Sequence, residues 1–113
     1  MGLGEAGARA VRGFVEGLRA AAAARVRSVV LFGSRARGDA RPESDIDLFV
    51  VVDRRDEALL EMIFTLAQDA LLTEHVLLSP KVCPEDRLRR MREMGDPLLA
   101  DLAREGRELW TTN

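Results

Sequence analysis

The spacing of apolar residues along the chain predicts helices and strands in alternation. In residues 5–25 and 56–72, apolar side chains recur three and four positions apart, which is typical of amphipathic helices. Residues 27–32 and 46–52 are instead mostly β-branched and other apolar residues, which favour buried strands. Because 46–52 is almost entirely apolar, we expect it to be a central strand covered on both faces.

The C-terminal half continues this alternation. Residues 74–82 are apolar around Pro80, and they predict a third strand at or near a sheet edge because proline cannot donate a ladder hydrogen bond. Residues 84–94 predict a short helix ended by Gly95. The Asp-Pro pair that follows is typical of a helix start and predicts a last helix through about residue 109.

These elements predict an α/β (α+β) fold, with a small mixed β-sheet and flanking helices. No linker or internal repeat divides the sequence, so we expect residues 1–113 to form a single domain. Trp110 lies near the C-terminus of a chain with few aromatic residues. Its indole either contacts a partner or seals the core of the domain itself.

Composition narrows the classes of function. A net charge of −2 gives no electrostatic reason to expect a nucleic-acid partner. No apolar run approaches the roughly 18 residues of a membrane span, so we expect no membrane partner and a cytoplasmic location. With one cysteine, Cys83, and one histidine, His75, the sequence offers no zinc ligand set. A single small domain is also short for an enzyme that must enclose two substrates, so a partner or a second copy would complete the site.

Two acids at the start of the second predicted strand are the strongest candidates for chemistry. Asp45 and Asp47 are separated by one apolar residue and follow the pair Gly33-Ser34 after a spacer. On a strand they point the same way, about 7 Å apart, and in an effective dielectric of 20 their charges repel by about 2 kcal/mol. Such a pair favours a hard cation such as Mg²⁺, and a glycine turn lets backbone N–H groups approach a phosphate. The alternative is a solvated strand start with no ligand.

The stretch from Gly33-Ser34 to Asp45-Ile46-Asp47, with the apolar strands on either side, resembles the defining motif of the DNA polymerase β-like nucleotidyltransferases. The resemblance is to the minimal, single-domain members of that superfamily. It implies the nucleotidyltransferase fold and the transfer of a nucleoside monophosphate from a nucleoside triphosphate to a hydroxyl group, with release of pyrophosphate. It also implies Mg²⁺ as the cofactor.

By position in the motif, the resemblance implies that Asp45 and Asp47 are catalytic and ligate Mg²⁺. It assigns nucleotide binding to residues of the intervening segment, namely Gly33, Ser34, Arg35, Arg37 and Ser44. The two arginines lie where guanidinium donors could meet phosphate charge, although both fit equally well as solvated loop residues.

Active members of this superfamily carry a third acid on a neighbouring strand, and this sequence offers no clear equivalent. The third predicted strand begins with Glu74, whose long side chain is a candidate for that catalytic role. The adjacent His75 is a second candidate because its unperturbed pKa lies near neutrality. If neither serves, Glu74 is simply a solvated residue at a strand end.

Two functions remain open from the sequence. The first is a Mg²⁺-dependent adenylyltransferase that uses ATP or another nucleoside triphosphate to modify a hydroxyl of a protein or small molecule. The second is a nucleotide-binding module, weak or inactive in catalysis, that neutralises a partner protein by binding. Minimal members of the superfamily are often antitoxins paired with helical HEPN-type toxins, and some adenylylate a toxin tyrosine. This chain has no tyrosine, so any tyrosine acceptor must belong to another molecule.

Overall fold

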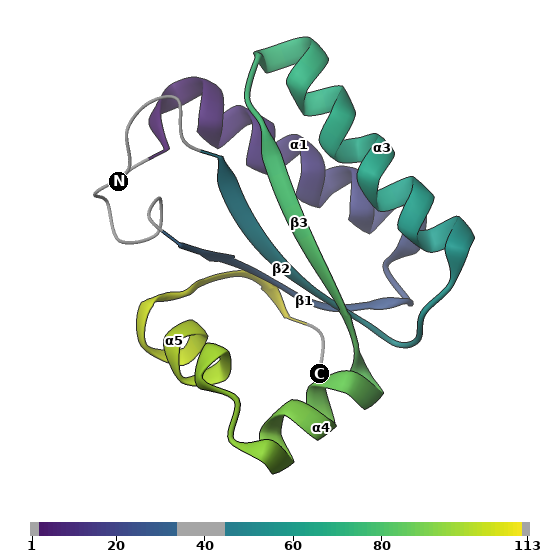
Figure 1. Cartoon of the computed structure of the whole chain (residues 1–113). Helices are drawn as coiled ribbons and strands as arrows, with labels where there is room; N and C mark the ends of the chain where they lie inside the picture. The colour runs from purple at the N-terminus through teal and green to yellow at the C-terminus, as the bar shows by residue number, and fades with distance from the viewer. Residues whose placement is uncertain (1–2, 34–44, 112–113) are drawn as a thin grey trace.

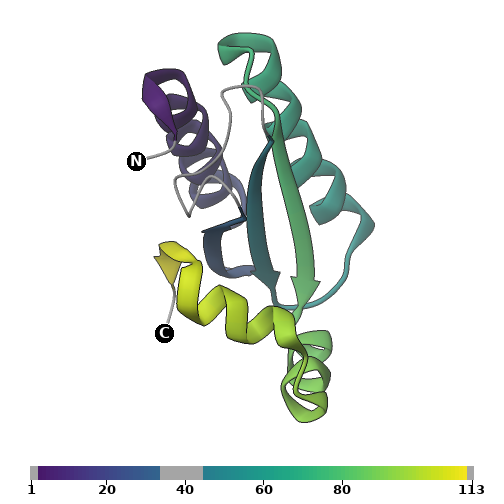
Figure 2. The ribbon, with the colours of Figure 1, turned by 60° about the vertical axis from the view of Figure 1, so that its left-hand side comes forward.

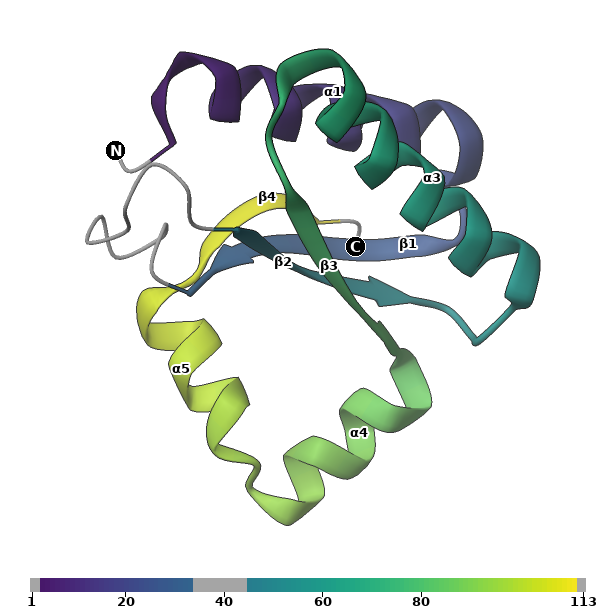
Figure 3. The ribbon, with the colours of Figure 1, turned by 45° about the horizontal axis from the view of Figure 1, so that its top comes forward.

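A four-stranded sheet lies between two layers of helices (Figures 1 and 3). The computed structural model describes residues 3–33 and 45–111. In chain order the elements are α1 (Gly4–Ala22), β1 (Val26–Phe32), β2 (Ile46–Val52), α3 (Glu57–Glu74), β3 (Leu78–Pro84), α4 (Glu85–Met94), α5 (Pro97–Glu105) and β4 (Arg107–Thr111). None of the helices in the described ranges is long and apolar enough to cross a membrane. The predicted mixed sheet with flanking helices is confirmed.

The strand order β3-β2-β1-β4 makes β2 an inner strand and β3 an edge strand. β1 pairs antiparallel with both β2 and β4, whereas β2 and β3 run parallel. Parallel neighbours need a long crossover, and α3 provides it. The predictions of a central strand at 46–52 and of an edge position for Pro80 are both confirmed.

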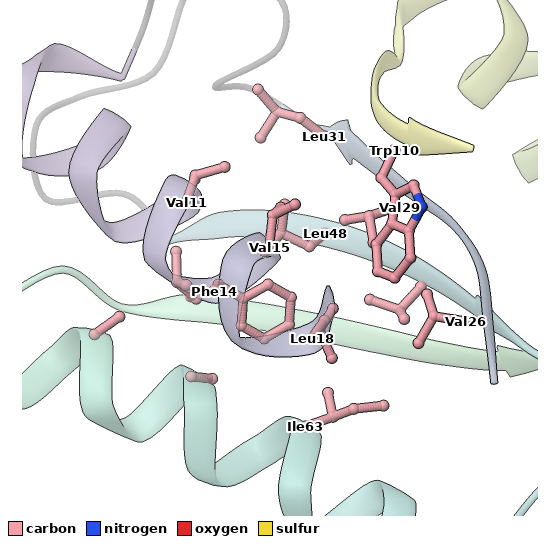
Figure 4. Close-up of a cluster of buried hydrophobic side chains, with 14 of the residues drawn as sticks. Val11, Phe14, Val15, Leu18, Val26, Val29, Leu31, Leu48, Ile63 and Trp110 are labelled. Carbon is pink, nitrogen blue, oxygen red and sulfur yellow. The ribbon is translucent and has the colours of Figure 1, made fainter. Parts of the chain in front are cut away.

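The larger hydrophobic core lies between the sheet and the pair α1 and α3. Phe14, Leu18 and Ile63 are fully buried there, packed against alternate residues of the strands (Figure 4). Leu48 and Val50 are among those strand residues. This face of β2 is therefore committed to packing.

The opposite face of the sheet is covered by α4 and α5 (Figures 2 and 3). A smaller cluster of buried side chains lies there, formed by Phe49, Val51 and Cys83 with partly buried neighbours. Because side chains alternate along a strand, the residue two positions before Phe49 faces this same layer. This rule places Asp47 on the α4/α5 side of the sheet.

Helix α3 begins where the sequence predicts but ends later. The Asp56 carboxylate caps it by accepting hydrogen bonds from the backbone N–H groups of Ala58, at 2.9 Å, and Leu59. The helix continues through Glu74, and His75 ends it in a left-handed conformation with φ of 57°. The prediction that the third strand begins at Glu74 is wrong, since β3 begins at Leu78.

The C-terminal segment also differs from its prediction. Helix α5 ends at Glu105 rather than near residue 109, and β4 follows it as a fourth strand that the sequence did not predict. In β4, Trp110 pairs with Val29 of β1 and is buried in the larger core, with the Arg19 guanidinium 5.2 Å from its ring centre. Trp110 therefore seals the core of this domain.

One ion-pair network ties the two turns at the far end of the sheet together. Arg25 Nε lies 2.7 Å from Asp53 Oδ2, and Arg25 Nη1 lies 3.2 Å from Asp56 Oδ2. Hydrogen bonding to Arg25 holds the pKa of both carboxyl groups below their usual value. Below about pH 4 the unfolded chain therefore binds more protons than the folded one, and stability falls as the pH drops.

We expect Asp53→Asn to flatten this acid limb of stability. Urea unfolding midpoints measured between pH 2 and pH 6 should fall steeply with acid in the wild type and less steeply in the variant. The matched change Asp69→Asn alters an exposed carboxylate of α3 and should keep the wild-type slope. An unchanged slope in Asp53→Asn would contradict a contribution from this network.

Candidate functional site

The Asp pair lies at the start of β2. Asp47 is the second residue of the strand, pairs with Phe32 of β1 and is half-buried on the α4/α5 side. Asp45 directly precedes the strand and is exposed. The two acids thus lie in the predicted segment, one in the sheet and the other at its rim.

Gly33 brings the end of β1 against the Asp47 carboxylate. Its backbone φ is +80°, an angle that residues with a Cβ rarely adopt. A Cβ added at this position would lie 2.5 Å from Asp47 Oδ2. Glycine is therefore required here both by its backbone angle and by the close approach of the acid. Gly33 and the second acid of the pair, which are 14 positions apart in the sequence, therefore lie side by side in the structure.

The environment of Asp47 disfavours its charge. Burial raises the pKa of its carboxyl group, the positive charge of Lys81 lowers it, and the like charge of Asp45 raises it, with a net shift upward. Desolvated carboxylates are costly to keep in a fold, and they concentrate at functional sites. The charged form of Asp47 therefore carries an electrostatic cost that a bound cation would offset.

The parallel strand β3 adds two polar residues that the sequence analysis did not single out. Asp47 pairs in register with Ser79, and Lys81 Nζ donates a hydrogen bond of 3.3 Å to Ser79 Oγ. Cys83 lies in the cluster under α4 and α5, so alternation places Ser79 and Lys81 on that same face. In the sequence, these two residues differ from their neighbours only in being polar at alternate positions of an otherwise apolar segment.

The candidates for the third acid lie elsewhere. Glu74 is the last residue of α3 and its carboxylate accepts a hydrogen bond of 2.9 Å from Arg9 Nε of α1, within the other helix layer. His75 is an exposed helix cap whose N–H donates to the Leu71 carbonyl at 3.0 Å. The structure brings neither residue to Asp47.

The remaining predicted site residues lie outside the described part of the chain. They are Ser34, Arg35, Arg37 and Ser44, and their nucleotide-binding roles stay predictions. Within the described ranges, no group of three or more acidic, histidine or cysteine side chains gathers to hold a metal ion.

The residues present nevertheless fit a magnesium ion that comes with a phosphate ligand. Mg²⁺ in nucleotide sites is held by one or two carboxylates, and substrate phosphates and water complete its coordination. Asp45 and Asp47 would supply the two carboxylates, and the missing Cβ of Gly33 leaves the Asp47 oxygen unobstructed on that side. The arrangement can thus bind a metal–phosphate pair, but the protein alone offers few ligands for a bare ion.

Comparison with known sequences gives this site a context. The sequence model of the nucleotidyltransferase domain family matches residues 11–98 of the chain. A candidate protein adenylyltransferase of Methanocaldococcus jannaschii is 44% identical over 45 residues, which are 40% of this chain and 45% of that protein. The chain therefore matches just under half the length of that curated relative.

Solved structures share the fold. A toxin–antitoxin structure with AMP-PNP aligns with a TM-score of 0.59 at 22% identity, covering 90% of this chain and 73% of that one. A tyrosine-to-alanine mutant of the toxin–antitoxin MntA–HpeT aligns with a TM-score of 0.60 at 22% identity, covering 91% and 73%. A candidate nucleotidyltransferase from Sulfolobus solfataricus gives 0.50 at 20% identity, covering 98% and 92%. At these identities the alignments establish the fold alone.

Proposed function

The chain belongs to the nucleotidyltransferase domain family, and from that premise we propose that it transfers a nucleoside monophosphate, AMP from ATP, to a hydroxyl group of another molecule. The observation that carries the proposal is the contact of Gly33 with the Asp47 carboxylate, with Asp45 beside it at the rim. The contact supports the proposal because a glycine lets a phosphate approach the backbone closely, and a pair of carboxylates is suited to Mg²⁺.

The reaction balances without a redox partner. The acceptor oxygen forms a bond to the α-phosphorus, and the bond from that phosphorus to the α–β bridging oxygen breaks. Pyrophosphate leaves with the bond's electron pair, and the hydroxyl proton passes to solvent. Because little covalent chemistry is asked of the protein, its residues act by positioning the reactants and by offsetting charge.

In this proposal Asp45 and Asp47 hold Mg²⁺, which, when bound, offsets the negative charge of the phosphates. Gly33 and Ser34 receive the triphosphate through backbone N–H groups and a hydroxyl. Arg35, Arg37 and Ser44 lie in the same segment of sequence and add donors to the phosphates. Glu74 has no support from its position and is left out of this site.

We further propose that the acceptor is a hydroxyl on a partner protein. The M. jannaschii relative is named for the adenylylation of proteins, and two of the structural neighbours are toxin–antitoxin assemblies. From the family resemblance we propose a helical HEPN-type toxin as the partner, with the present chain as antitoxin. Since this chain contains no tyrosine, a tyrosine acceptor has to come from the partner.

One observation supports the alternative of a binding module. Among the described residues, no third acid lies with Asp45 and Asp47. The site therefore offers a metal ion fewer negatively charged ligands than a site with three carboxylates would. In that case the chain binds the nucleotide and the partner but transfers nothing. The two functions differ in one measurable product.

The test uses ATP labelled at either the α- or the γ-phosphate, incubated with Mg²⁺, this protein and the product of the neighbouring gene. The proposal predicts that α-label becomes bound to the partner while γ-label is released as pyrophosphate. Transfer of γ-label would show phosphoryl transfer instead. A stable complex that stays unlabelled would support the binding module.

A further inference from the structure

Lys81 extends along β3 toward the acids. Its backbone pairs with Phe49, yet its ammonium donates to Ser79 Oγ at 3.3 Å, and Ser79 is the residue paired with Asp47. The side chain therefore runs from its own position back toward the Asp47 end of the strand. Its positive charge acts on the Asp47 carboxyl group and offsets part of the rise in pKa that burial causes there.

Open space borders this lysine. Lys81 lines a cavity of about 480 Å³ together with Phe32, Phe49 and Met91. Phe32 is the cross-strand partner of Asp47, and Phe49 lies two residues after Asp47 on β2. The two phenyl rings pack edge to face, with their centres 6.3 Å apart. The cavity is therefore bordered by Lys81 and by two residues adjacent to Asp47.

A site with three carboxylates would need an acid on β3, but β3 has a serine and a lysine beside Asp47. Ser79 occupies the position across from Asp47, and the charged group that reaches it is a cation. A triphosphate at Asp45 and Asp47 brings several further negative charges to this place. A lysine ammonium is a compact charge with three donors, well suited to phosphate oxygens.

We propose that Lys81 is a nucleotide-binding residue, positioned by Ser79, whose ammonium contacts the phosphate chain of the nucleoside triphosphate held at Asp45 and Asp47. The inference rests on the proposed function, because it needs a triphosphate at the two acids. It adds a cation from β3 to a site whose described residues are Gly33, Asp45 and Asp47.

A lysine on an edge strand has another common use, which is to discourage pairing with a second sheet. β3 is such an edge, and Lys81 is exposed. If edge protection were its whole role, its removal would promote self-association and leave nucleotide affinity unchanged. The two roles are therefore separated by measuring affinity and oligomeric state on the same samples.

The first experiment is calorimetric titration of MgATP into wild type, Lys81→Met and Lys81→Arg. We expect Lys81→Met to lose about tenfold to a hundredfold in affinity, because one charged hydrogen-bonding partner is lost. Lys81→Arg should retain most of the affinity. Arg12→Met removes one exposed positive charge from α1, in the other helix layer, and should bind ATP like the wild type.

The second experiment uses the wild-type protein and so does not depend on how a variant folds. Lys81 is the sole lysine of the chain, so reductive labelling with pyridoxal phosphate followed by peptide mass spectrometry reports on one side-chain amine. We expect MgATP to protect Lys81 from labelling and adenosine to leave it reactive. Labelling that MgATP does not reduce would overturn the proposal.

Failure of the inference differs from failure of the proposed function. If wild type binds MgATP through Asp45 and Asp47, but Lys81→Met binds it equally well, the lysine has no role at the phosphates and only this inference fails. If wild type binds no MgATP at all, the proposed function fails, and the inference fails with it.

Discussion

Replacing Asp47 by asparagine should reduce nucleotide transfer about a hundredfold or more while leaving the fold at least as stable as the wild type. Loss of a group that merely orients a metal ligand costs about tenfold to a hundredfold, so loss of the ligand itself should cost no less. Stability should not fall, because burial disfavours the charged form of Asp47 and the asparagine removes that charge.

The raised pKa of Asp47 also predicts how the stability of the protein changes with pH. The folded-state pKa of Asp47 is raised, so the folded protein binds more protons than the unfolded chain in the window above the usual carboxyl pKa of about 4. Wild-type stability should therefore decline through this window as the pH rises, and Asp47→Asn should lack that decline. Asp69→Asn is the matched substitution on α3 and should change neither transfer nor this profile. A strongly destabilised Asp47→Asn would identify the acid as structural.

Gly33→Ala should be the second most damaging change, and Gly95 supplies its control. Both glycines have positive φ, +80° and +66°, but an added Cβ meets Asp47 Oδ2 at 2.5 Å only at Gly33, whereas at Gly95 nothing lies within 4 Å. Gly95→Ala should therefore cost only the backbone strain, about 1–2 kcal/mol of unfolding free energy. Gly33→Ala should cost more than this because the carboxylate must also move.

The same displacement should reach the chemistry. A shift of about 1 Å in a reacting group can cost about a hundredfold in rate, so Gly33→Ala should lose transfer as well as stability. Denaturant unfolding and the α-label transfer assay, run side by side on both alanine variants, separate the two losses. Gly95→Ala should keep wild-type transfer. If the two variants lost equal amounts of stability and of transfer activity, the contact of Gly33 with Asp47 would have no role in function.

The central strands and the Asp pair were predictable because local sequence determines them. Residues 48–52 are apolar on both faces, a pattern that few structures other than an inner strand can satisfy, and the acids come just before this run. Asp56 likewise marks the start of α3 by its own chemistry as a cap. These features need no knowledge of distant parts of the chain.

The errors occurred where a neighbour from elsewhere in the chain decides the outcome. Residues 107–111 form a strand because the free edge of β1 is available to pair with them, although their sequence also continues the apolar pattern of α5. The end of α3 depends on His75 adopting a left-handed conformation, which is uncommon for a residue with a side chain. Neither condition is written in the local pattern.

Lys81 was missed for a related reason. Which residue of β3 lies opposite Asp47 depends on the register of two parallel strands joined by an 18-residue helix. A shift of one residue would turn Ser79 and Lys81 to the other face of the sheet. Only the structure fixes that register, and with it the chemistry beside the acids.

The most direct test of the account is calorimetric titration of MgATP into wild type and the double variant Asp45→Asn/Asp47→Asn, with circular dichroism to show that both are folded. The account predicts saturable binding to the wild type and loss of most of that affinity in the double variant. Equal binding by the two proteins would contradict a metal–nucleotide site at these acids.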